Sequence, residues 1–218
     1  MDNLQDEYKT VKTPVSGIFR EKGSKFIAYA FETESEFQFK TTLDAVIKDH
    51  FKARHHCFAY LLGPNGNNFR YNDDGEPAGT AGIPIYNQIR SHELYNTGIV
   101  VVRYFGGTKL GVPGLINAYK SAAKDAIDNA EIIIKYIEKT IEIQYTYDQT
   151  GDIMNLINAG GYKIISNEYD PYPKLLLKVR ASKTSELNKQ ILASLLKRNF
   201  SDIDGNEIIE GLKINIYA

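Results

Sequence analysis

The sequence has a single cysteine, Cys57, and no tryptophan among its 218 residues. One cysteine cannot form an internal disulfide, and neither a CxxC nor an HExxH motif occurs, so no zinc site is predicted and no residue is assigned to a metal. No window approaches the ~20 apolar residues of a membrane-spanning helix. The first ten residues are polar and acidic, unlike a signal peptide. These absences predict a cytoplasmic protein without membrane partners, and no motif indicates a cofactor.

The sequence also has no excess of either positive or negative charge. The chain has 26 lysines and arginines against 27 acids, and the two signs also balance within residues 1–135 and within residues 136–218. Neither part is therefore expected to coat a nucleic-acid duplex by charge alone. Between Gly98 and Lys124, however, there are cations and no acid. That segment is either an anion-facing patch or a solvated helix face.

The hydrophobic pattern predicts an α+β protein of two domains, residues 1–135 and 136–218. In the first, strands and helices follow in irregular order: strands within 15–31 and at 56–62, 69–72 and 97–105, and helices at 34–50, 80–90 and 114–129. The second has the β-α-β-β-α-β order of a ferredoxin-like fold, with Asp148 or Thr150 as the first helix cap. Such a sheet leaves one face exposed, which suits docking.

The stretch RYFGGTKLGVPGLINAY (103–119) leads from an apolar strand through a glycine-rich bend into a helix. Gly106 and Gly111 have phosphate-loop spacing, but Val112 and Pro113 stand where Lys and Ser/Thr are required, which argues against a nucleotide triphosphatase. With Pro113 as the first helical residue, free N–H groups could receive an anion. The alternative is a bend that only permits close packing. The candidate anion-binding residues are Arg103, Tyr104, Gly106, Gly107, Lys109, Gly111 and Gly114.

The stretch NDDGEPAGTAGIPI (72–85) places three carboxylates within four residues, without the spacing of an EF-hand. We expect a turn in which one Asp binds backbone N–H groups and another pairs with an arginine. A two-carboxylate magnesium site is the alternative. The residues expected to form this loop wall are Asp73, Asp74, Gly75, Glu76, Gly79 and Thr80.

In ARHHCFAY (53–60), strand alternation puts His55, Cys57 and Ala59 on one face, so the adjacent histidines point apart. Cys57 is either a buried thiol beside a core histidine or half of a thiolate pair with His55. If the protein is an enzyme, His55, Asp73, Asp74 and Glu76 are the candidate acid–base residues.

Taken in order, ARHHCFAY, DDGEPAGTAGIPI and VVVRYFGGTKLGVPGLINAYKSA resemble the YigZ/IMPACT family (UPF0029). The resemblance implies a first domain like ribosomal protein S5 domain 2 and a ferredoxin-like second domain similar to one in elongation factor G. Eukaryotic relatives restrain a translation-control kinase by binding its activator protein. Two departures matter: Pro113 replaces a usual glycine, and Asn117 replaces a usual basic residue.

The resemblance and the cationic segment favour a non-enzymatic regulator that binds RNA, the ribosome or a translation factor through the glycine-rich loop. A protein–protein adaptor without nucleic acid and an enzyme of unknown reaction are the alternatives. The ligand and the oligomeric state stay open, as does whether residues 72–85 and 103–119 face one cleft.

Overall fold

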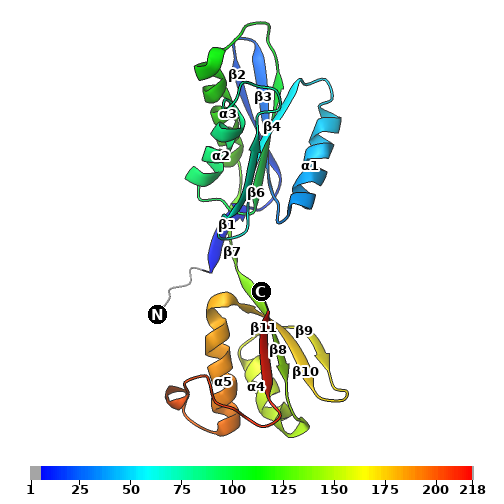
Figure 1. Cartoon of the computed structure of the whole chain (residues 1–218), viewed down its shortest axis with the longest axis vertical. Helices are drawn as coiled ribbons and strands as arrows, with labels where there is room; N and C mark the ends of the chain where they lie inside the picture. Colours follow the sequence, from blue (N-terminus) through cyan, green and yellow to red (C-terminus); the bar gives the residue numbers. More distant parts are fainter. Residues whose placement is uncertain (1–5, 218) are drawn as a thin grey trace. The chain divides into compact units, whose positions relative to one another are not determined.

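The computed structural model describes residues 6–217, which form two compact units (Figure 1). One consists of residues 7–135, and the other of residues 136–217 together with Asp6. Each unit mixes helices with strands around its own hydrophobic cluster, which confirms the α+β class. Among the residues described, no helix is long and apolar enough to cross a membrane.

The unit of residues 7–135 is built on a five-stranded antiparallel sheet. Its order is β2 (Val15–Glu21), β3 (Ser24–Glu32), β6 (Thr97–Tyr104), β4 (His55–Leu62) and β5 (Asn68–Asn72). The apolar, β-branched run of β6 is buried along almost its whole length because this strand lies in the middle of the sheet. At one edge, all five residues of β5 are exposed.

Helices cover both faces of this sheet. Figure 1 shows α2 (Gly82–Ser91) and α3 (Gly111–Asp128) on one face and α1 (Glu36–Asp49) on the other. The alternation predicted for β4 is confirmed: Cys57 and Ala59 join the core under α2 and α3, whereas Phe58 and Tyr60 pack on the α1 side.

Two features of this unit differ from the sequence prediction. β1 (Glu7–Val11) and β7 (Ile132–Tyr136) form a two-stranded sheet that was not predicted. α3 begins at Gly111, so Pro113 is its third residue and not its first. Proline is tolerated at either place because the N–H groups of the first helical turn have no intrahelical acceptor.

The unit of residues 136–217 has a four-stranded antiparallel sheet. Its order is β11 (Lys213–Tyr217), β8 (Glu138–Gln144), β10 (Lys174–Arg180) and β9 (Lys163–Glu168). α4 (Thr150–Ala159) and α5 (Thr184–Leu196) pack on one face, which confirms the predicted βαββαβ order. The predicted cap was wrong: Thr146 forms a capping box with Gln149 at a 3₁₀ turn that continues into α4.

The outer face of this second sheet carries paired charges. Lys174 lies 3.4 Å from Glu142, and Lys178 lies 3.5 Å from Glu138. Each of these two lysines therefore faces an acid on the neighbouring strand, which compensates its charge locally.

Candidate functional site

Asp73 organises the acidic loop that links β5 to α2. Its carboxylate accepts hydrogen bonds from the backbone N–H groups of Gly79 (2.8 Å), Ala81 (2.9 Å) and Gly82 (2.8 Å). The last two open α2, where the side chain of the N-cap residue Ala81 cannot accept a bond. Asp73 therefore supplies the N-cap acceptor that Ala81 lacks, although it precedes the helix by several residues. Its bonds also fix the conformation of the acidic loop.

Asp74 turns the chain so that the next acid points inward. It has a positive φ of 41°, and Gly75 follows with φ 81°. Its carboxylate accepts a bond from the backbone N–H of His56 (2.6 Å), and its carbonyl accepts one from Nδ1 of His55 (2.7 Å). This pair of left-handed residues fixes the acidic loop against the start of β4.

Glu76 is the point at which residues 72–85 and 103–119 meet. Its side chain is buried, and Oε1 accepts bonds from Nη1 of Arg103 (2.5 Å) and from the hydroxyl of Tyr119 (2.9 Å). Nε2 of His55 lies 3.9 Å from the same oxygen. We call His55, Glu76, Arg103 and Tyr119 the Glu76 cluster. The expected Asp on backbone N–H groups is confirmed in Asp73, but the prediction that a second Asp pairs with an arginine was wrong, because the arginine's partner is Glu76.

The Glu76 cluster lies largely within the fold. Arg103 is 7% exposed, and its guanidinium lies 5.5 Å from the ring centres of both Phe26 and Phe105. Burial raises the pKa of Tyr119, which keeps its hydroxyl protonated as a donor to Glu76. No polar role was predicted for Tyr119, which lies among the buried apolar residues of α3. The signal for such a role was a hydroxyl among these apolar residues, because a buried tyrosine needs a partner.

The candidate acid–base residues therefore converge only in part. His55 and Glu76 come together, whereas Asp73 and Asp74 are bonded to backbone N–H groups of the loop and of β4. General acid–base catalysis needs two groups within reach of one substrate. Within residues 6–217, no group of three His, Cys, Asp or Glu side chains is arranged to hold a metal ion.

Cys57 is fully buried, and its thiol donates to the carbonyl of Asp73 (3.0 Å). Burial in apolar surroundings raises the pKa of this thiol, so the nucleophilic thiolate is disfavoured. We expect a thiol reagent such as dithionitrobenzoate to leave the folded protein unmodified and to titrate one thiol per chain in urea. Rapid modification without urea would contradict the buried position.

The glycine-rich loop begins with a backbone contact to the turn between β2 and β3. The N–H of Gly106 donates to Oγ of Ser24 (3.1 Å), and a Cβ on Gly106 would lie 1.9 Å from the carbonyl carbon of Gly23. Gly107 and Gly111 have positive φ values of 89° and 74° with open space around them. Gly106 is thus required for close packing, while its neighbours shape an exposed bend.

The start of α3 is open to solvent and carries no negative charge. Its N-cap residue Leu110 provides no side-chain hydrogen bond, and no acid lies in the first turn. Lys109 is exposed just before it and has no ion pair with any residue from 6 to 217. The positive end of the helix and this cation together form a surface that can receive an anion.

Two of the predicted anion-binding residues lie elsewhere. Arg103 belongs to the Glu76 cluster, and the hydroxyl of Tyr104 contacts Nδ1 of His50 (2.9 Å), which follows α1. Thr80, from the predicted loop wall, is buried and donates its hydroxyl to the carbonyl of Pro77 (2.7 Å). Of the predicted cations, Lys109 is the one exposed beside the glycine-rich loop.

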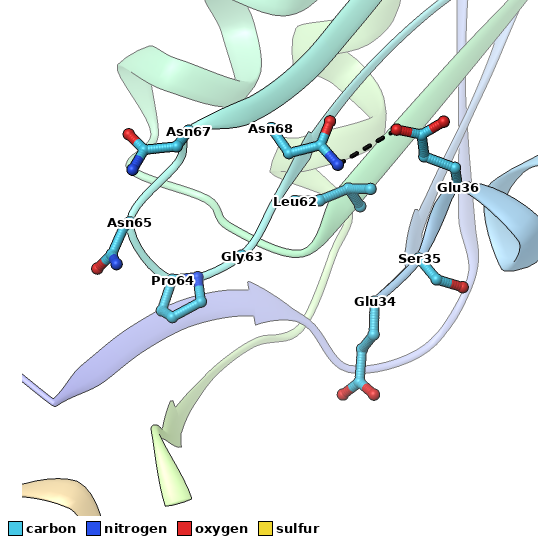
Figure 2. Close-up of a pocket in the computed structure, with 9 residues that line it drawn as sticks. All are labelled: Glu34, Ser35, Glu36, Leu62, Gly63, Pro64, Asn65, Asn67 and Asn68. Carbon is cyan, nitrogen blue, oxygen red and sulfur yellow. Dashed lines mark hydrogen bonds between the residues drawn. The ribbon is translucent and has the colours of Figure 1, made fainter. Parts of the chain in front are cut away.

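A hollow of about 440 Å³ lies where the β4–β5 hairpin meets the start of α1 (Figure 2). Glu34 and Glu36 both line it, but in Figure 2 their carboxylates point away from each other. Asn68 donates to the carboxylate of Glu36 (3.2 Å). The two acids of this hollow therefore do not form a converging carboxylate pair.

Comparison of the sequence with known proteins shows the family of this chain. The model of the Impact N-terminal domain matches residues 22–127. "IMPACT family member YigZ" of Escherichia coli (strain K12) is 32% identical over 82% of this chain and 88% of its own length. The chain belongs to the IMPACT family. A further IMPACT family member, YvyE of Bacillus subtilis (strain 168), is 28% identical over 92% of each chain.

The chain is also similar to a solved structure. A crystal structure described as that of a hypothetical protein covers 99% of this chain, with a TM-score of 0.70 and 28% identity. The matched residues 22–127 include the whole Glu76 cluster, the acidic loop and the glycine-rich loop. These three features therefore lie in the part of the chain that matches the Impact N-terminal domain.

Proposed function

We propose that this IMPACT family member is a non-enzymatic, translation-associated binding protein that contacts RNA or the ribosome through the glycine-rich loop, residues 105–114. The observation that carries the proposal is the exposed start of α3, which has no capping side chain and no acid in its first turn and lies beside Lys109, a cation with no ion pair among residues 6–217. Backbone N–H groups at a helix start and a nearby cation are the groups that receive phosphate oxygens in many proteins.

The other motif residues support this surface from below. Arg103 is bonded to Glu76, and Gly106 packs against the turn at Gly23. The chain is therefore held at two residues where it enters the glycine-rich loop. We assign Arg103 and the acidic loop to positioning of the glycine-rich loop, and Lys109 with the N–H groups of α3 to direct contact. A pre-positioned loop loses less conformational entropy on binding.

Replacing Lys109 by alanine is expected to weaken binding to single-stranded RNA and to purified ribosomes. Removing one phosphate contact should also reduce the slope of log affinity against log salt by about 0.7 for single strands. Fluorescence anisotropy across a salt series measures both quantities for RNA, and co-sedimentation measures ribosome binding.

Lys120→Ala is the matched control, since this residue is also exposed and lies on the same helix, away from its start. It should leave affinity and slope unchanged. Equal behaviour of the two variants would contradict the proposed site. Failure of the wild-type chain to bind RNA or ribosomes at any salt would contradict the proposal and favour a protein adaptor.

A further inference from the structure

A second hollow, which we call the aromatic hollow, lies between α2 and the edge strand β5. Its volume of about 650 Å³ is within the roughly 300–1,000 Å³ typical of ligand sites. Four aromatic side chains line it: Phe69 and Tyr71 from β5, Tyr86 from α2, and Tyr95. None of them belongs to the Glu76 cluster or to the glycine-rich loop.

The rings of the aromatic hollow form a platform with uncovered surface. Phe69 stacks on Tyr86 with ring centres 4.9 Å apart and planes 26° apart, and Tyr71 lies 6.0 Å from Tyr86. Phe69 is 48% exposed and Tyr71 is 40% exposed. Both project from β5, whose five residues are all exposed, so the fold leaves these rings accessible to another flat ring.

The rim of the aromatic hollow is polar, with one uncompensated positive charge. Arg90 of α2 lines it, and its guanidinium forms no ion pair or hydrogen bond within the described part of the chain. The one acid of the lining, Glu93, is bonded to Lys9 (2.9 Å). Asn65 and Asn87 add amide donors and acceptors.

We propose that the aromatic hollow binds an unpaired base of single-stranded RNA, with Phe69 and Tyr71 stacking on the base and Arg90 contacting a neighbouring phosphate. Aromatic platforms beside cations are the common means of holding single strands. The proposal goes beyond the contact at Lys109 and does not depend on it. The cationic, amide-rich rim favours a nucleotide over an apolar peptide side chain, because a phosphate can pair with Arg90 and an apolar side chain cannot.

The test uses the full-length chain and a labelled oligouridine of about 12 nucleotides, within the range of known single-strand sites. Phe69→Ala should weaken binding by about 5- to 150-fold, since each base–aromatic stack contributes about 1–3 kcal/mol. Phe69→Tyr should retain binding because it keeps the ring. Arg90→Gln should lower the salt slope by about 0.7.

Phe37→Ala is the matched control, because Phe37 is 82% exposed on α1 and lies outside the hollow. Equal affinity of Phe69→Ala and Phe37→Ala would overturn the inference. So would equally tight binding of a duplex of the same length, because paired bases are not available for stacking. Circular dichroism and melting temperature confirm that each variant folds.

The variants also separate this inference from the proposed function. A loss with Lys109→Ala alone overturns the aromatic hollow and supports the glycine-rich loop. A loss with Phe69→Ala alone supports the hollow and contradicts the loop. An absence of oligouridine binding by the wild-type chain overturns the inference, and capture of a hydrophobic peptide by the same rings then becomes the favoured alternative.

Discussion

Replacing Glu76 by alanine is expected to destabilise the unit of residues 7–135 by about 3–5 kcal/mol, because it leaves a buried guanidinium without its counter-charge. Arg103 is 7% exposed, and its Nε already lacks a hydrogen-bond partner. The variant would also deprive the hydroxyl of Tyr119 of its acceptor. Urea unfolding, followed by circular dichroism and tyrosine fluorescence and fitted with separate transitions for the two units, measures the change.

Two further variants make this result interpretable. Glu131→Gln removes an exposed partner of Lys12 and should cost at most about 0.5 kcal/mol. The double variant Glu76→Leu with Arg103→Met removes both buried charges and should be more stable than Glu76→Ala alone. A loss below about 1 kcal/mol for Glu76→Ala would show that the ion pair is not desolvated as its burial implies.

The residues of the acidic loop and of the glycine-rich loop form one connected set of structural contacts. Asp73 binds the start of α2, Glu76 joins the acidic loop to β6 and α3, and Gly106 fixes the end of β6 against the turn at Gly23. The contact of Asp73 is local, whereas those of Glu76 and Gly106 join segments that are far apart in the chain. What first looks like a carboxylate cluster for catalysis is thus used mainly to position two loops and two helix starts.

Part of this set of contacts could be predicted from the local sequence pattern. Alternation in β4 decided the faces of Cys57 and Phe58, and the clustered acids and glycines of residues 72–85 predicted a turn with internal partners. Both rest on interactions between residues close in sequence, where strand period and turn chemistry are reliable guides.

The features that the sequence did not predict depend on contacts across long stretches of chain. β1 is a short segment in a polar N-terminal region, and it becomes a strand only because β7, more than a hundred residues later, pairs with it. The sequence pattern does not distinguish Arg103 from a surface cation, because its burial depends on the contact with Glu76. The aromatic hollow likewise requires α2 to lie against β5, and the spacing of Phe69, Tyr71 and Tyr86 does not indicate it.

Replacing Gly106 by alanine is expected to destabilise the same unit by about 3 kcal/mol, the upper part of the range for overpacking. The added Cβ would lie 1.9 Å from the carbonyl carbon of Gly23 and 2.1 Å from the nitrogen of Ser24. Both are backbone atoms, so no side-chain rotation relieves the clash, and the turn and the loop must separate. Urea unfolding measures the loss.

Gly107→Ala separates this clash from the general effect of losing a glycine. Gly107 has φ 89° and nothing within 4 Å of its added Cβ, so only backbone strain of about 1 kcal/mol is expected. RNA affinity should follow the same order, because only Gly106→Ala forces the glycine-rich loop away from the turn that supports it. Equal losses of stability in the two variants would mean that the loop shifts freely, and Gly106 would then have no special role in positioning Lys109.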